Sequence, residues 1–430
     1  MPLHPRAGTS RASERLRLTP AGAAALSLLL AGMAACGKRE SRRAPVLVPA
    51  PMTSPAPVGA AEPFLAAGGG RVHLSWLARN GAQVTFAYAT YSQNVWSEPH
   101  TIAAGPGMFA NWADFPSFAP LADGTFAAHW LEKHGDSKYA YDVDLTRSLD
   151  GVNWSAPSHP HRDRTAAEHG FVSIVPEMLG GGTCIWLDGR EYEGKEEGAP
   201  GVQMQLRSAT WLPGGEWSDE TVLDPRVCDC CQTAAVRTAS GVLVAYRDRS
   251  DREIRDISLV RRDGETWSAP YALSSEGWEI QGCPVNGPAL SALGDRVAAA
   301  WFTMARDTAQ VKLAFSDDGG ATFSRPVRID EGGTSGRVDV LVLPSGDALV
   351  LWLAANAQGK SEIRARRVQA GLQLDPSFVV AETSAERSSG FPHVVHSDGV
   401  LYFAWTESGD PSNVRLATLP VPAAWHASGS

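Results

Sequence analysis

An aromatic residue recurs along the chain at a nearly constant interval, and this repeat limits the possible folds more than any other feature of the sequence. Each aromatic residue ends an apolar run that follows a glycine-bearing turn, and successive aromatics are 54, 56, 60, 55, 51 and 53 residues apart. A glycine-bearing turn between two apolar runs is a strong signal for a β-hairpin. A fixed period of this length indicates that one structural unit is repeated. The seven aromatics are Trp76, Trp130, Trp186, Tyr246, Trp301, Trp352 and Trp405.

The repeated unit predicts a blade of four antiparallel strands. Beyond the hairpin, each unit has a polar loop, a third strand, a turn with an aromatic residue and a short fourth strand. No segment has a convincing 3.6-residue apolar period, so we expect little helix. Seven such units predict an all-β protein, a seven-bladed β-propeller over residues 62–420. The last unit lacks an obvious fourth strand, and residues 46–48 (Val-Leu-Val) could supply it and close the ring.

A turn motif with aspartate and glycine accompanies the repeat. Residues 316–323 read Ser-Asp-Asp-Gly-Gly-Ala-Thr-Phe. The serine and aspartate can hydrogen-bond their own backbone, and glycine adopts a positive φ without strain. Weaker copies lie at residues 148–154 and 262–267. These segments resemble the Asp-box of the sialidase superfamily, where the motif marks a β-propeller and lies away from the active face. The resemblance implies six blades, the usual number in sialidases, as the alternative to seven.

The N-terminal segment has the features of an export signal. Residues 21–35 form an apolar run that is short for a membrane span and ends in small residues before Cys36. The sequence Met-Ala-Ala-Cys at residues 33–36 resembles the lipobox of bacterial lipoproteins. Residues 1–36 are therefore interpreted as a signal peptide whose Cys36 becomes lipidated, with a plain secretory signal as the alternative.

The segments at the two ends of the repeat are interpreted as connections. Residues 37–61 are rich in proline and read as a tether, and residues 421–430 read as a C-terminal tail. Gly37 after the cysteine fits, by resemblance, sorting to the outer membrane. We expect a monomeric lipoprotein of the bacterial cell envelope, on its periplasmic or surface face, attached to the membrane through its lipid only.

The charge of the chain bears on its partners. Residues 1–43 hold eight of the 38 Lys and Arg and two of the 47 Asp and Glu, so the rest has 30 bases, 45 acids and a net charge of −15. An acidic body argues against nucleic acid as a partner.

The repeat also predicts which loops carry the chemistry. In an up-and-down blade, the first-to-second and third-to-fourth turns lie on one rim, and the other loops and the connections between blades lie on the opposite rim. The first rim has short glycine turns, whereas the second has every long polar loop. We expect these polar residues to converge at the mouth of the central channel, although Arg–Asp runs such as residues 247–256 could instead be solvated surface pairs. The residues singled out are Tyr141, His161, Asp163, Glu168, His169, Arg190, Arg247, Arg249, Arg337 and Asp339.

Four cysteines lie in the segments that lead into blades four and five. In an exported protein disulfides are the default, and four cysteines allow three pairings. We favour a bridge between Cys283, which leads into blade five, and one of the three cysteines ahead of blade four. Two alternatives stay open: free thiols, and a copper or zinc site. The ligands of the metal site would come from Cys228, Cys230, Cys231, Cys283, His161 and His169.

The sialidase resemblance implies a set of catalytic residues. Sialidases hold the substrate carboxylate with three arginines, use a tyrosine paired with a glutamate as the nucleophile and an aspartate as the acid/base; the tyrosine nucleophile is unusual among glycosidases. Guanidinium groups suit a carboxylate because they bind both of its oxygens. The resemblance implies Tyr141 or Tyr139 as the nucleophile, Glu168 as its partner and Asp163 as the acid. The ligand-binding candidates are Arg190, Arg247 or Arg249, Arg337 and the neighbouring Asp339.

The match to the sialidase pattern is incomplete. No Arg-Ile-Pro-like segment opens the first blade, the last blade has no tyrosine in the expected setting, and a cysteine-rich channel mouth is foreign to that pattern. We therefore predict an exported propeller that binds a carbohydrate or other small anionic ligand, or a metal ion (copper or zinc), at a channel mouth lined by Cys, His and Arg. The alternative is an exo-α-sialidase-type glycoside hydrolase that acts on sialic acid or a related acidic sugar.

Overall fold

The apolar runs and glycine turns of the repeat fold into antiparallel β-strands. The structure of the protein, a computed structural model, describes residues 46–135, 137, 139–177, 181–195 and 201–426. The expected signal peptide, the lipidation site Cys36 and residues 37–45 of the expected tether lie outside the described residues. Within the described ranges, no helix is long and apolar enough to cross a membrane.

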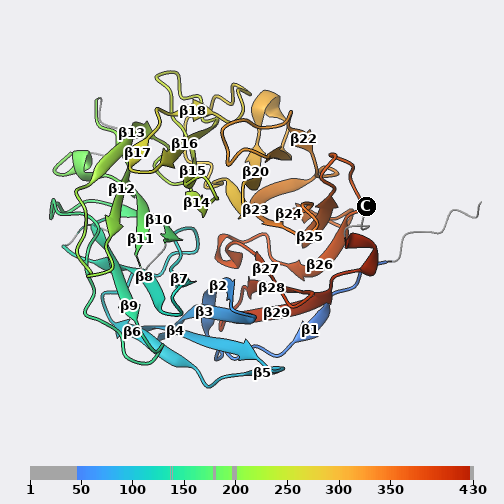
Figure 1. Cartoon of the computed structure of the whole chain (residues 1–430), viewed down its shortest axis with the longest axis horizontal. Helices are drawn as coiled ribbons and strands as arrows, with labels where there is room; N and C mark the ends of the chain where they lie inside the picture. Colours follow the sequence, from blue (N-terminus) through green and yellow to red (C-terminus); the bar gives the residue numbers. More distant parts are fainter. Residues whose placement is uncertain (1–45, 136, 138, 178–180, 196–200, 427–430) are drawn as a thin grey trace, which may run out of the picture. The chain divides into compact units, whose positions relative to one another are not determined.

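Seven antiparallel sheets follow one another along the chain as the blades of a propeller (Figure 1). Blade one contains β2 (Ala60–Gly68), β3 (Arg71–Asn80), β4 (Gln83–Ser92), β5 (Val95–Trp96) and β6 (His100–Gly105). Blade two contains β7 (Ser117–Pro120), β8 (Phe126–Lys133) and β9 (Tyr141–Ser148), and single bridges from β9 to Trp154 and Ser158 complete its outer edge. Blade three contains β10 (His169–Pro176), β11 (Gly182–Asp188), β12 (Met204–Trp211) and β13 (Thr221–Val227).

The remaining four blades repeat the same order of strands. Blade four contains β14 (Ala234–Arg237), β15 (Val242–Arg247), β16 (Ile257–Asp263), β17 (Thr266–Trp267) and β18 (Tyr271–Ala272). Blade five contains β19 (Ala289–Leu293), β20 (Arg296–Thr303), β21 (Gln310–Ser316) and β22 (Val327–Arg328). Blade six contains β23 (Thr334–Val342), β24 (Ala348–Ala355), β25 (Ser361–Val368) and β26 (Phe378–Thr383). Blade seven contains β27 (His393–Ser397), β28 (Val400–Glu407), β29 (Asn413–Pro420) and β1 (Ala50–Met52).

Both the blade count and the low helix content predicted from the sequence are confirmed. The seven repeated aromatics each lie on the second strand of a blade, and all are buried. The helical segments among the described residues are short 3₁₀ turns: η2 (Arg190–Tyr192), η3 (Ala305–Asp307), η4 (Arg387–Ser389) and η5 (Ala423–Trp425).

Strand β1 closes the ring, because it comes from the beginning of the described chain and lies in the last blade beside β29 (Figure 1). Ala50 is paired with Thr418, and Met52 with Leu416. Residues 46–48 are predicted from the sequence to fill this place, but the closing strand lies two residues beyond them, at Ala50–Met52. The central residue of β1 is Pro51, and proline has a low propensity for strands, so this strand was not predicted. Proline is nevertheless tolerated on an edge strand, because no neighbouring strand needs its missing N–H.

The domain limits expected from the sequence shift accordingly. The range interpreted as a tether, residues 37–61, contains β1 and the first two residues of β2, so the propeller begins at Ala50 rather than at residue 62. At the other end, Trp425 lies in the range interpreted as a tail, yet it is buried in the hydrophobic cluster of blades six and seven.

The core lies between neighbouring blades. Between blades five and six, for example, Val311 and Leu313 of β21 pack with Val340 of β23 and Trp352 of β24, and all four are buried. Complete burial of an apolar side chain of this size contributes about 1.5–3 kcal/mol. The alternation of apolar residues along each strand therefore fixes which face meets the next blade.

The turn at residues 316–323 of blade five packs closely against blade four. The carboxylate of Asp318 accepts hydrogen bonds from the Ser316 hydroxyl (2.7 Å) and the Thr322 amide (2.8 Å). Gly320 has a φ of 90°, and a Cβ added there would lie 2.6 Å from Leu243 of blade four. The turn is therefore a structural element on the rim opposite the long polar loops.

Candidate functional site

Polar side chains gather on the loop rim where blades two and three meet. The start of β9, the connection from blade two to blade three, and the start of β10 supply Asp142, His161, Asp163 and His169, which we call the His–Asp cluster. The imidazole rings of His161 and His169 are stacked, with centroids 3.9 Å apart and planes at 4°. Because the rings are stacked face to face, their nitrogen atoms remain accessible to carboxylates on two opposite sides of the stack.

One carboxylate lies at each edge of the stacked rings. Asp142 Oδ1 is 3.5 Å from His161 Nε2 and 3.4 Å from His169 Nδ1. On the other edge, Asp163 Oδ1 is 3.4 Å from His161 Nδ1, and Asp163 Oδ2 is 3.2 Å from His169 Nε2. Asp188, at the end of β11, is completely buried behind them, 3.8 Å from His169 Nε2.

These contacts shift the pKa values of His169, His161 and Asp163 in different directions. Burial lowers the pKa of His169, but the carboxylates of Asp142, Asp163 and Asp188 outweigh burial and raise the pKa to about 10. Burial lowers the pKa of His161. Burial raises the pKa of Asp163, but its partners His161 and His169 outweigh it and hold the pKa far below the usual range. At neutral pH Asp163 is therefore a carboxylate, which does not suit the proton-donor role that the sialidase resemblance implies.

The sequence-predicted partners Tyr141 and Glu168 lie together beside this cluster. The Tyr141 hydroxyl donates a hydrogen bond to Glu168 and lies 3.5 Å from Asp114 Oδ2. The Tyr141 ring is buried and stacks on Phe109, with centroids 4.6 Å apart. Burial raises the pKa of Tyr141, and the charges of Glu168 and Asp114 raise it further. Glu168 also lines a small cavity of about 110 Å³ with Tyr139, Tyr192 and Lys195 among its walls.

Two of the predicted arginines are partly buried on the rim and are paired with acids. Arg190 donates to Asp188 (2.6 Å) and Glu220 (2.7 Å). Arg249 donates to Asp229 (3.0 Å) and to Glu253. Their guanidinium groups are therefore already engaged by carboxylates of the protein.

The other two predicted arginines are buried and bind backbone carbonyls. Arg247 donates to the carbonyls of Asn286 (2.7 Å) and Phe302 (2.7 Å). Arg337 donates to the Gly390 carbonyl (3.1 Å) and the Ser389 hydroxyl (2.6 Å), and lies over the Trp112 ring. The structure thus does not bring the predicted arginines together as one carboxylate-binding group.

The cysteines form a separate group. Cys230 and Cys283 form a disulfide, which confirms the favoured bridge between Cys283 and the cluster ahead of blade four. Cys228 and Cys231 are buried thiols with their sulfur atoms 3.0 Å apart. Burial raises the pKa of Cys228, but its contacts with Cys231 and Arg255 outweigh burial and lower it to about 7. Among the described residues, groups with metal-ligand spacing are either all-cysteine or His with Asp, so His161 and His169 do not join the cysteines.

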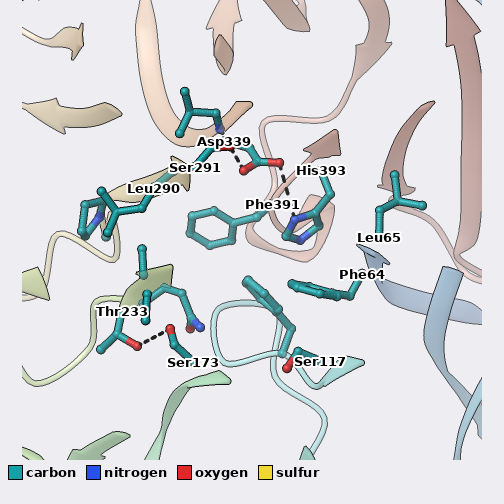
Figure 2. A pocket seen from close by; sticks show the side chains of 18 of the residues that line it. Phe64, Leu65, Ser117, Ser173, Thr233, Leu290, Ser291, Asp339, Phe391 and His393 are labelled. Carbon is teal, nitrogen blue, oxygen red and sulfur yellow. Dashed lines mark hydrogen bonds and ion pairs between the residues drawn. The ribbon is translucent and has the colours of Figure 1, made fainter. Parts of the chain in front are cut away.

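Asp339 lies in the central channel rather than beside a ligand-binding arginine. A cavity of about 310 Å³ runs between the innermost strands, walled by aromatic and small side chains (Figure 2). In Figure 2, Asp339 and His393 face each other from blades six and seven, with Asp339 Oδ2 3.8 Å from His393 Nδ1. Burial raises the pKa of Asp339 to about 7 and lowers the pKa of His393 to about 4.

A larger cavity, about 640 Å³, lies at the His–Asp cluster. Of its lining residues, His161 was singled out from the sequence, and the others lie in the long polar loops expected to converge on this rim. Asp142 stands at the start of a strand and His134 in the loop before it, whereas His159 lies two residues before His161, and the repeat places all three in the long polar loops of this rim. The lining residues are His134, Asp142, His159, His161, Arg162 and Arg164.

Comparison with known proteins gives a likeness of fold. No protein-family model matches the chain, and no curated protein matches it in sequence. The ulvan lyase of polysaccharide lyase family PL25 has a TM-score of 0.57 and 10% identity, over 86% of this chain and 96% of that one. Polysaccharide lyase Uly1 has a TM-score of 0.50 and 9% identity, over 86% and 91%. A Hadza microbial sialidase has a TM-score of 0.45 and 12% identity, over 78% and 73%. At such identities the likeness shows the fold alone.

Proposed function

We propose that the chain is an exported, carbohydrate-binding propeller that holds an acidic saccharide in the cavity at the His–Asp cluster. The lining of that cavity carries the proposal, because three histidines and two arginines surround one carboxylate in about 640 Å³. Pockets for small ligands commonly span about 300–1,000 Å³. Guanidinium and imidazole donors favour carboxylate or sulfate groups on such a ligand.

Arg164 supports this proposal more directly than the predicted arginines do. Its side chain lines the cavity and is exposed, and no side chain or carbonyl among the described residues is bonded to it. Its φ is 60°, a conformation that costs a non-glycine residue about 1–3 kcal/mol and is often kept at functional sites. Arg162, in contrast, already donates to Asp219 (2.8 Å) and to the Trp217 carbonyl (2.9 Å). An anion in the cavity would therefore find Arg164 free.

The class of ligand is also supported by the structural neighbours. Three solved structures that resemble the chain with a TM-score of 0.50 or more are polysaccharide lyases, and the ulvan lyase has been solved with -[GlcA(1-4)Rha3S]-, a saccharide with carboxylate and sulfate groups. A protein of the cell envelope, anchored through Cys36, would meet such polymers outside the cytoplasm. This placement is part of the proposal and rests on the sequence.

A second candidate is a glycoside hydrolase of sialidase type. The observation in its favour is the hydrogen bond between Tyr141 and Glu168, the pair that the sialidase resemblance implies. Against it, Arg190, Arg247, Arg249 and Arg337 are each engaged by other groups of the protein. Binding without turnover therefore stays the first candidate.

Calorimetric titration of the purified chain with oligosaccharides of glucuronate tests the proposal. We expect binding of the acidic oligosaccharide, no binding of a neutral oligosaccharide of the same length, and at least a tenfold loss of affinity (about 1.4 kcal/mol) in Arg164→Gln. Arg325→Gln is the matched control, since Arg325 is an exposed arginine on the opposite rim. Equal affinity of the Arg164→Gln variant and the wild type, or no binding of any acidic oligosaccharide, would overturn the proposal.

The hydrolase candidate is tested on the same samples. Release of sugar from a fluorogenic sialoside or uronide, lost in Tyr141→Phe while the affinity for the oligosaccharide stays unchanged, would establish turnover. No release by the wild type would leave the binding function alone.

A further inference from the structure

We infer that the rim carries a zinc-class metal site made of Asp142, His159 and His161, with His134 as an additional nitrogen donor. The four side chains also line the proposed saccharide cavity, but the metal site does not rest on the proposed function. Four of the 11 histidines of the chain lie around Asp142 and Asp163, a concentration that the rest of the fold does not repeat among its described residues. One ligand atom of each of Asp142, His159 and His161 lies within 4.8 Å of the other two.

Hydrogen bonds within the protein do not account for these atoms. Asp142 Oδ1 and His134 Nδ1 are buried and have no hydrogen-bond partner among the described residues. His134 Nδ1 lies 2.8 Å from Asp142 Oδ2, which places an imidazole nitrogen beside the second oxygen of the same carboxylate. Buried polar atoms without partners are rare in folded proteins, and where they occur they often bind an ion or an ordered water.

The separation of the ligand atoms suits a tetrahedral metal. Metal–nitrogen and metal–oxygen bonds of about 2.0–2.2 Å place two ligand atoms of a tetrahedron about 3.4 Å apart. The distance from Asp142 Oδ1 to His161 Nε2 is 3.5 Å. That distance is too long for a strong hydrogen bond and fits two ligands of one ion.

The second nitrogen of His159 is held as it is in known metal sites, where a carboxylate or carbonyl usually takes the N–H opposite the metal. His159 Nδ1 lies 3.1 Å from Asp144 Oδ1 and 3.2 Å from the Val143 carbonyl, which leaves the lone pair on Nε2.

The tautomer of His161 is set by the backbone. Its Nε2 accepts a hydrogen bond (3.3 Å) from the Val143 amide, so the lone pair is on Nε2, while its Nδ1 lies 3.4 Å from Asp163 Oδ1 and has no hydrogen-bond partner among the described residues. A metal at Nε2 would replace that amide as the partner. His169, stacked on His161, stays with Asp163 and Asp188 on the other edge.

The donor set selects the class of metal. Imidazole nitrogens with one carboxylate suit Zn²⁺, Cu²⁺, Ni²⁺ and Fe²⁺, whereas Ca²⁺ and Mg²⁺ prefer oxygen ligands. All candidate ligands also line the cavity, so a metal there would keep a coordination position open to a small molecule, as catalytic zinc sites do. The cysteine cluster is excluded from this set by its separate position.

Metal titration of the chelator-treated full chain, with no saccharide present, tests the site. Calorimetry with ZnCl₂ should give one equivalent bound, and at least a tenfold weaker affinity in His159→Gln, whose side chain is half exposed and whose fold should persist. His134→Gln should weaken binding in the same direction. His100→Gln, a partly buried histidine on β6, is the matched control and should bind zinc as the wild type does.

Cobalt absorption distinguishes this site from the cysteines. The Co²⁺ form should show visible ligand-field bands without sulfur-to-cobalt charge transfer, and Cys228→Ser should leave the spectrum unchanged. A charge-transfer band lost in Cys228→Ser would move the metal to the thiols and overturn the inference, as would wild-type zinc affinity in His159→Gln. Arg164→Gln should bind zinc normally, so failure of the saccharide proposal and failure of the metal site give different results.

Discussion

Whether an arginine can meet a ligand depends on what already surrounds its guanidinium group. Arg164 lines a cavity without a protein partner among the described residues, whereas Arg247 is 2% exposed and donates to carbonyls from two other segments. The sequence offers both as arginines in long polar loops of the same rim. Only the fold distinguishes the free guanidinium group from the one that ties blades four and five together.

Arg247→Lys should therefore destabilise the protein without reducing ligand affinity in the molecules that fold. A lysine keeps the charge but cannot reach the carbonyls of Asn286 and Phe302 together, so at least one buried carbonyl loses its donor. We expect the free energy of unfolding to fall by about 2–4 kcal/mol in urea titrations. Arg249→Lys, at a more exposed arginine, is the control and should change stability by under about 1 kcal/mol. Unchanged stability with lost saccharide binding would return Arg247 to the ligand site.

Asp339 should make stability depend on pH. Burial raises its pKa to about 7, and the unfolded carboxyl titrates near 4, so the folded state holds a proton that the unfolded state releases between these values. Stability contributed by this proton is complete below about pH 4 and is lost as the pH rises to about 7. Asp339→Asn cannot titrate, so the free energy of unfolding of this variant should rise relative to that of the wild type between those pH values, by about 3 kcal/mol in urea titrations. A constant difference between the two proteins across that range would show that Asp339 does not titrate there.

At the scale of strands and loops, the sequence predicts the elements better than the contacts between them. The aromatic of each second strand, such as Trp352, identifies its blade because burial on a strand has a strong and local signature. Strand β1 lacked that signature, since Pro51 occupies its centre. Three of the four residues of the His–Asp cluster were singled out from the sequence, because His161, Asp163 and His169 share one polar loop, whereas Asp142 joins them only after β9 and β10 pack together.

The segments that lead into blades four and five are joined by the Cys230–Cys283 disulfide, which closes a loop across 53 residues. Alkylation of the denatured, unreduced protein should label Cys184, Cys228 and Cys231, whereas Cys230 and Cys283 should be labelled only after reduction. Cys283→Ser should lower stability by about 3–4 kcal/mol, because a loop of this length restricts the unfolded chain strongly. Peptide mapping by mass spectrometry gives the labelling pattern. Alkylated Cys283 without reductant would contradict the bridge.

At the scale of the whole propeller, closure of the ring depends in part on one short strand, β1. Seven blades packed side by side leave a first and a last blade that must meet, and β2 of blade one packs against β27 and β28 of blade seven. Strand β1, from the other end of the described chain, forms the outer edge of blade seven, as its position beside β29 in Figure 1 shows. The number of blades was predictable from the repeat, but the closing strand was not, because a strand of three residues is too short to show an alternation of apolar and polar residues.

Removing β1 should therefore weaken the whole ring rather than one blade. Deletion of residues 1–52 takes away the pairing of Ala50 with Thr418 and of Met52 with Leu416, and leaves β29 as an unpaired edge. We expect a free energy of unfolding lower by roughly 2–4 kcal/mol, seen as a lower melting temperature, and concentration-dependent association through the exposed edge. Deletion of residues 1–45 is the matched control, since it leaves β1 in place and should melt as the full chain does. Thermal unfolding and light scattering measure both properties, and if the two deletions behaved alike, closure by β1 would contribute nothing to the ring, whose stability would then come from the contacts of β2 with blade seven.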